Sequence, residues 1–202
     1  LRAKNTPLDL PQLSAKNASF ELKDVSIKKG GSVFSSEGSG TLSEGLINGL
    51  SYHDMSGKFS ADDSGVYFPE ISLSALGGII SGSLKLNNNG VAEFSYLNLE
   101  RVILKDPSKV FSKYDFKITK LNLSSVTAMI PSKDLLLSNI TGQALDVNVD
   151  NGSFTCNFKG NIEEISRPIM LLSLEDNKAD VHCDRESWDV KLQGNVFQGS
   201  YE

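Results

Sequence analysis

The chain has 202 residues, of which 39% are hydrophobic and 22% are charged. That is enough apolar sequence for a real core, and it excludes a disordered or collagen-like chain. The formal net charge is -5, with 20 Lys and Arg against 25 Asp and Glu. Because no basic block stands out, a nucleic-acid-binding surface is not expected. The longest nearly apolar stretch, 168–174, is far shorter than the roughly 20 residues of a membrane-spanning helix.

Apolar residues alternate with polar residues along most of the chain. The alternation runs through 20–27, with a slip at Lys23 and Asp24, and returns at 71–73, 84–86, 94–96, 121–123, 145–149, 154–158, 181–183 and 188–192. A period of two is typical of strands that bury one face. The sequence is also rich in Gly, Ser and Asn, which favour turns over helices. The pattern therefore predicts an all-β, mostly antiparallel fold.

The hairpins can be registered from the turn residues. With Asn151 and Gly152 as the central pair of a two-residue turn, the expected cross-strand pairs are Val149 with Phe154, Val147 with Cys156 and Leu145 with Phe158. The run 87–90 fits a three-residue loop better, which predicts the pairs Leu86 with Ala92, Leu84 with Phe94 and Gly82 with Tyr96. A third hairpin pairs Cys183 with Trp188, Val181 with Val190 and Ala179 with Leu192.

Helix signals are scarce. Asp106 and Pro107 are good residues to begin a short helix over 108–114, and 124–130 could add a turn or two. The segment 162–174 reads either way, because its Glu pair favours a helical start while Pro168 and the apolar run after it favour a strand. No linker cuts the chain. We therefore expect one continuous β domain over 1–202, with a weak boundary near residue 106.

The sequence offers little chemistry. His53 and His182 both fall at polar positions, where we expect them to face solvent, and no catalytic or metal-binding constellation is found. No cofactor is expected. Cys156 and Cys183 fit neither a zinc site nor a CxxC motif. Both lie on apolar faces, so an oxidising compartment would allow a disulfide between them, and buried free thiols are the alternative.

A long sheet with one apolar face must cover that face, close on itself or bind something apolar. The first option gives a β-sandwich or β-roll. For an arbitrary all-β domain this sandwich or roll, whose two halves pack together, is the favoured outcome.

Three segments resemble the repeat of AsmA-like envelope proteins, the family that includes AsmA, TamB and the GspN component of type II secretion. Residues 71–104 hold a strand, a Gly-rich bend, the strand Gly82-Ser83-Leu84-Lys85-Leu86 and a following apolar strand. The segments 20–27 and 188–201 resemble parts of the same unit.

The resemblance implies a U-shaped, taco-like curved sheet whose apolar inner face forms a groove for phospholipid between the inner and outer membranes. It also implies a periplasmic location, an inner-membrane anchor outside this sequence, and envelope protein partners. The expected groove residues are those on the inward face of the registered hairpins: Leu84, Leu86, Phe94, Tyr96, Leu145, Val147, Val149, Phe154 and Phe158. The alternative is a structural component of a secretion or surface apparatus with no lipid conduit. An enzyme is not expected.

Overall fold

The computed structural model describes residues 2–10, 13–27, 33–47, 50–62, 64–87, 91–107, 115–150, 153–184, 187–196 and 199–201. Nearly all of these residues lie in strands, which confirms the all-β prediction. The chain forms two compact units, Leu1–Ser95 and Tyr96–Glu202. The division falls ahead of the weak boundary that we placed near residue 106. We call the units unit 1 and unit 2 and describe each by itself.

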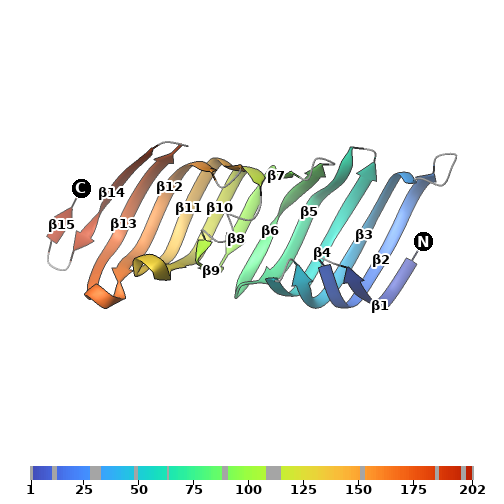
Figure 1. Ribbon diagram of the computed structural model, residues 1–202, viewed down its shortest axis with the longest axis horizontal. Helices are drawn as coiled ribbons and strands as arrows, with labels where there is room; N and C mark the ends of the chain where they lie inside the picture. Colours follow the sequence, from blue (N-terminus) through green and yellow to red (C-terminus); the bar gives the residue numbers. More distant parts are fainter. Residues whose placement is uncertain are drawn as a thin grey trace. The chain divides into compact units, whose positions relative to one another are not determined.

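Unit 1 is an antiparallel sheet in which every strand pairs with the next strand in the sequence (Figure 1). Its strands are β1 (Arg2–Leu10), β2 (Leu13–Ile27), β3 (Val33–Ile47), β4 (Leu50–Asp62), β5 (Gly65–Ala75), β6 (Gly78–Asn87) and β7 (Ala92–Phe94). Short connections between successive strands that run in opposite directions are typical of such a meander.

Unit 2 is also a sheet of antiparallel strands, with two short strands added parallel to one of them. Its strands are β8 (Leu97–Glu100), β9 (Ile103–Lys105), β10 (Phe116–Ile130), β11 (Leu135–Asp150), β12 (Ser153–Arg167), β13 (Leu172–Cys183), β14 (Trp188–Val196) and β15 (Gly199–Tyr201). Strands β10 to β15 pair antiparallel in chain order, and β8 and β9 run parallel to β10. Two short 3₁₀ helices, η1 (Pro131–Lys133) and η2 (Pro168–Met170), turn the chain between β10 and β11 and between β12 and β13.

The core of unit 1 lies on one face of its sheet, which we call the inner face. Tyr52 is 2% exposed and contacts a cluster of small residues and Leu42. Its hydroxyl donates a hydrogen bond to the Ser14 carbonyl at 2.9 Å. A Cβ atom on Gly45 would lie 2.8 Å from that hydroxyl oxygen and 1.8 Å from the Ser14 carbonyl oxygen, so only glycine fits there. Aromatic side chains thus lie against glycines of the neighbouring strand.

Unit 2 also buries one face, and we use the same name for it. The most buried side chains on its inner face are Ile118, Val126, Ala128, Ile140, Ala144, Val147, Val149, Cys156, Ile162, Asn177, Ala179 and Cys183. Phe158 lies across two glycines, because Cβ atoms on Gly142 and Gly160 would lie 3.0 and 2.7 Å from its ring. The floor of this face is therefore made largely of small and β-branched residues.

The predicted hairpin registers are largely confirmed. Val149 pairs with Phe154, and Asp150 pairs with Ser153 across the two-residue connection; Asn151 and Gly152 lie outside the described residues. Leu86 pairs with Ala92, as the three-residue loop requires. All three expected pairs between β13 and β14 are present. The predicted pair of Gly82 with Tyr96 is wrong, because Tyr96 lies beyond the end of β7.

A second predicted pair, Leu145 with Phe158, is also wrong. Leu145 pairs with Asn157 rather than Phe158, and Ala144 takes the position opposite Phe158. The cause is a bulge at Asp146, whose φ of 51° lies in the left-handed region and adds one residue to β11. Leu145 therefore points to the other face and is 43% exposed.

The structure shows strand at two places where the sequence allowed a helix. Residues 124–130 belong to β10, so the predicted helical turns there are wrong. The segment 162–174, for which the sequence left helix and strand open, forms strand on both sides of η2. In both places the apolar residues complete an inner face, and this burial outweighs local helix propensity. The expected helix at 108–114 lies outside the described residues.

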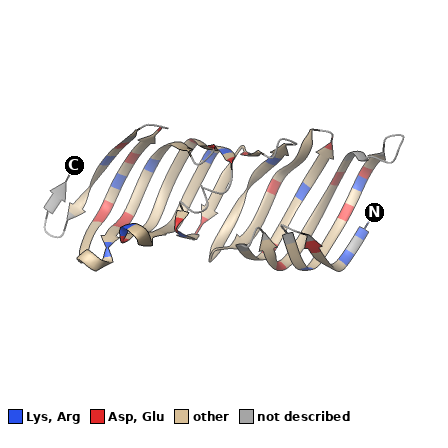
Figure 2. Cartoon of the chain, viewed as in Figure 1, with Lys and Arg blue, Asp and Glu red and all other residues tan. Residues whose placement is uncertain are grey.

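Charged residues of both signs are spread over both units (Figure 2). Several form exposed ion pairs between neighbouring strands, such as Arg2 with Glu21 at 2.8 Å and Lys159 with Asp180 at 3.2 Å. Such pairs contribute little to stability, but they keep the outer face polar.

Candidate functional site: the inner apolar face

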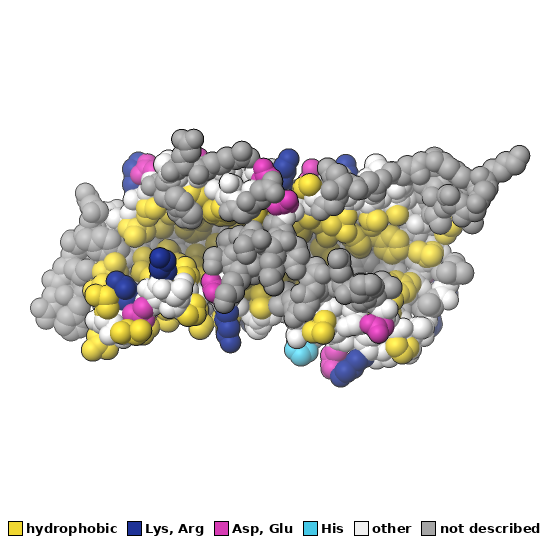
Figure 3. Space-filling model, in the orientation of Figure 1, with side chains coloured by type: hydrophobic (Ala, Val, Ile, Leu, Met, Phe, Trp, Pro, Cys, Tyr) yellow, Lys and Arg dark blue, Asp and Glu magenta, His cyan; other side chains and the backbone are white. Residues whose placement is uncertain are grey.

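The inner face of each unit is an apolar surface. Hydrophobic side chains gather where the molecule is hollowed in the view of Figure 3. In unit 1 the face is built by Ala15, Ala18, Phe20, Leu42, Tyr52, Met55, Phe59, Phe68, Ile71, Leu73, Ala75, Ile80 and Leu84. None of these side chains is charged, so the surface suits an apolar ligand.

The expected groove residues divide into three groups. Val147 and Val149 are 3% and 1% exposed and belong to the packed floor. Leu84, Phe94, Phe154 and Phe158 are half-buried strand residues, and Leu86 is 40% exposed.

Two of the expected residues fall elsewhere. Tyr96 is half-buried but lies between β7 and β8 rather than in a strand. Leu145 leaves the inner face because of the bulge described above. These two are the expected groove residues that no strand places on an inner face.

Sequence reasoning missed several residues of the floor. Tyr52 and several alanines, including Ala15, Ala18 and Ala144, are buried on the inner faces. The signal was weak because only large apolar residues were counted in the alternation. Tyr52 and Met55 also stand three residues apart, which breaks a strict period of two.

Cys156 and Cys183 are direct cross-strand partners on the inner face of unit 2. They are free thiols whose Sγ atoms lie 3.0 Å apart. Burial, followed by the hydrogen bond with Cys183, raises the pKa of the Cys156 thiol to about 12. The thiol is therefore neutral at physiological pH and a poor nucleophile.

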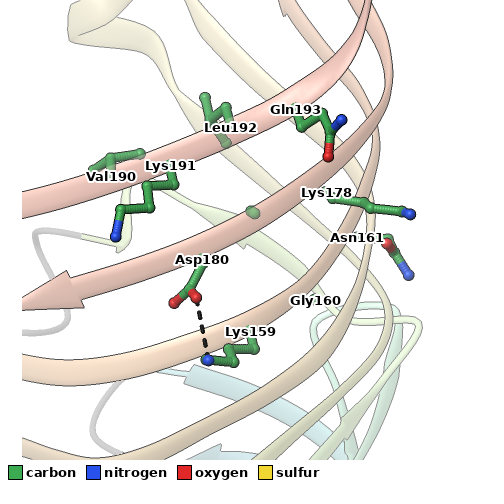
Figure 4. Close-up of a pocket in the computed structure, with 10 residues that line it drawn as sticks. Lys159, Gly160, Asn161, Lys178, Asp180, Val190, Lys191, Leu192 and Gln193 are labelled. Atoms are coloured by element: carbon green, nitrogen blue, oxygen red, sulfur yellow. Dashed lines mark ion pairs between the residues drawn. The ribbon is translucent and has the colours of Figure 1, made fainter. Parts of the chain in front are cut away.

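A depression in unit 2 lies away from the expected groove residues. It has a volume of about 940 Å³ and spans β12, β13 and β14. Figure 4 shows two rows of polar side chains around it, with Lys159, Asp180 and Lys191 in one row. Along each strand, the polar residues that line the depression alternate with residues such as Gly160 and Ala179, whose side-chain positions are on the inner face. The depression thus lies between charged rows on the outer face.

Other chemistry is sparse. His53 and His182 are exposed, and no cluster of metal-ligating residues is found within the described ranges. No helix among the described residues is long and apolar enough to cross a membrane. Comparison with known proteins found no matching family model, no matching curated protein and no matching solved structure.

Proposed function

We propose that the inner apolar faces bind the acyl chains of phospholipid or another apolar ligand, and that the chain is the periplasmic part of an AsmA-like envelope protein. Its inner-membrane anchor would lie outside this sequence, its partners would be other envelope proteins, and its role would be transport rather than catalysis. The observation that supports this most is the arrangement of the strands. Every described strand is hydrogen-bonded to its neighbours in the sheet order, so no described strand belongs to a separate sheet that could form the second layer of a sandwich.

The energetics of such binding are favourable without any charged contact. Each methylene group that moves from water to an apolar surface contributes about 0.8 kcal/mol. An acyl chain could therefore be held by side chains such as Phe154, Phe158 and Val181, which are half-buried on the inner face of unit 2. Their remaining exposed surface is the part that a ligand would cover.

The first test is native mass spectrometry of protein purified from cells. We expect phospholipid to co-purify. A photo-crosslinking amino acid at Phe158, whose ring lies on the inner face, should also form an adduct with lipid in the folded protein.

The crosslink can be tied to the inner face by a pair of variants. Val181 is the cross-strand partner of Phe158 and is half-buried, so Val181→Asp places a charge beside the probe. Leu145→Asp is the matched control, because Leu145 lies on the outer face. We expect Val181→Asp to abolish the lipid adduct with a small fall in Tm, and Leu145→Asp to retain it. If the parent protein forms no adduct and Val181→Asp unfolds, the inner face is an ordinary core.

A second candidate function rests on the packing of the floor. Tyr52, Val126 and Val149 are at most 2% exposed, as in a core that needs no ligand. This favours a structural component of a secretion or surface apparatus. Absence of co-purified lipid, together with a cooperative and ligand-independent unfolding transition, would support it.

A further inference from the structure

Unit 2 contains two turns of the same construction on the same rim of its sheet. Each begins with Pro in the first position of a 3₁₀ helix and ends with a residue in the left-handed region. In η1 the Asp134 N–H donates to the Pro131 carbonyl at 3.1 Å, and in η2 the Leu171 N–H donates to the Pro168 carbonyl at 3.3 Å. The two turns therefore have the same backbone conformation and the same closing hydrogen bond.

The side chains of the two turns differ completely. After its proline, η1 continues with Ser132, Lys133 and Asp134, and the last of these has a φ of 50°. Asp adopts this conformation more readily than a bulky residue does. The sequence of η1 therefore shows that this turn geometry needs no apolar side chain.

At the corresponding positions η2 carries Ile169, Met170 and Leu171, which are 84%, 58% and 93% exposed. Leu172, the next residue, is 47% exposed. Leu171 has a φ of 52°, where a bulky side chain is uncommon. Neither the turn nor a core accounts for four consecutive exposed apolar residues, and we call Ile169–Leu172 the apolar tip.

The backbone of the apolar tip is hydrogen-bonded to the neighbouring turn. The Asp134 carboxylate accepts a hydrogen bond from the Ile169 N–H, with its two oxygens 3.2 and 3.0 Å away. This bond joins the two turns along the rim. It also brings the polar turn, with its exposed Lys133, next to the apolar tip.

We propose that the apolar tip inserts into the interfacial region of a lipid bilayer that carries anionic headgroups. Four side chains on a convex turn cannot supply the roughly 800 Å² per partner of a stable protein interface. A bilayer needs no complementary shape, and it accepts aliphatic side chains at the boundary between headgroups and acyl chains. The exposed cations Arg167 and Lys133 beside the tip suit lipid phosphates.

The proposal does not depend on ligand binding in the groove, because the apolar tip lies on the rim. Its probe is flotation of the 202-residue chain with vesicles of phosphatidylcholine alone or mixed with phosphatidylglycerol. We expect binding to both, with tighter binding to the mixture that weakens as salt rises.

The matched variants exploit the two equivalent turns. In Ile169→Ser/Met170→Gln/Leu171→Asn the tip becomes polar like η1, and Asn suits the left-handed position, so folding should be preserved. We expect its vesicle affinity to fall about tenfold or more. Ile103→Ser/Leu145→Ser removes apolar surface that is exposed elsewhere in unit 2, and its affinity should not change. Lys133→Gln/Arg167→Gln should lose only the preference for the anionic vesicles.

Two results would overturn the proposal. One is that the parent chain does not float with either kind of vesicle. The other is that the polar tip variant, shown by circular dichroism to be folded, floats as well as the parent chain. Native mass spectrometry of the same variant then separates this proposal from the groove, because lipid bound to the inner face should still co-purify.

Discussion

At the scale of single residues, short polar side chains set where the strands change phase. Among the residues at positive φ are Asn5, Asp24, Asn139, Asp146 and Asp176, all within strands. Asn and Asp are the non-glycine residues that adopt this conformation most readily. The slip that the alternation showed at Lys23 and Asp24 is one such position, so a break in the alternation at an Asp marked this bulge in the sequence.

Asn177 shows how a buried polar residue stabilises such a bulge. It is 0% exposed on the inner face of unit 2. Its Nδ2 donates to the Ile162 and Leu174 carbonyls, each at 3.0 Å. Asn177 lies in the same inward row as Ala179 and Val181, and its amide satisfies two carbonyls beside the bulge at Asp176.

We expect Asn177→Leu to lower the free energy of unfolding by about 1–3 kcal/mol, because two buried carbonyls lose their donor. Chemical denaturation measures this loss. Asn161→Ala is the matched control, since Asn161 is an exposed strand residue of unit 2, and it should change stability by less than about 0.5 kcal/mol. An equal effect of the two substitutions would show that the Asn177 amide does not stabilise the bulge.

At the scale of strands, turn chemistry predicted more than composition did. Loop length and the inward pattern were enough to register most pairs of three hairpins. The abundance of Asn, which we read as a turn signal, belongs partly to strands. Asn122 donates to Asn98 at 2.6 Å and accepts from Gln143 at 3.0 Å, forming an amide ladder across β8, β10 and β11. Composition cannot separate these two uses of Asn.

The bulge at Asp146 is the element that decides which residues face inward on β11. We expect Asp146→Val to destabilise the protein by about 1–2 kcal/mol, because a β-branched residue is strained at a φ of 51°. Asp146→Gly, which is free of that strain, should be nearly neutral. Urea denaturation compares the two. If Val is tolerated as well as Gly, the bulge is absent and Leu145 would return to the inner face.

At the scale of the whole molecule, the fold class could be predicted and the site only in part. Alternation identifies a one-sided sheet because burial of one face imposes a period of two. It does not show how deeply each inward residue is buried, since that depends on curvature and on neighbours from other strands. Val149 and Phe154 are paired on the same face, yet one is 1% exposed and the other is half-buried.

The dependence of stability on pH follows from groups in both units. Hydrogen bonds and charge from Arg2 and Lys16 lower the pKa values of Glu21 and Glu44. A carboxyl whose pKa is lowered by folding stabilises the folded state above its unfolded pKa, and this contribution is lost as the pH falls through the folded value. The acid loss should therefore begin as the pH falls below roughly 5, and it should shrink in salt because both pairs are exposed.

At alkaline pH the dependence has the opposite sign, because stability falls as the pH rises. Burial raises the pKa of Tyr52, and burial with the Cys183 hydrogen bond raises the pKa of Cys156 to about 12. Each group stabilises the folded state fully below its unfolded pKa, near 9 for the thiol and 10 for the phenol, and the contribution is lost as the pH rises through the folded value. We therefore expect a plateau of stability between roughly pH 5 and 9, followed by a fall.

Denaturation in urea at a series of pH values measures this profile, and two variants assign its alkaline limb. Tyr52→Phe should lower stability by about 1 kcal/mol at neutral pH, because the hydrogen bond to the Ser14 carbonyl is lost. Its stability should then fall less steeply above pH 9 than that of the parent chain. Cys156→Ala should make the limb shallower in the same way, provided that thiol titration of the unfolded, unreduced protein finds two free thiols. A bridged pair would titrate no thiol and leave the phenol alone to account for the limb, whereas a limb unchanged by both variants would mean that neither buried group is linked to folding.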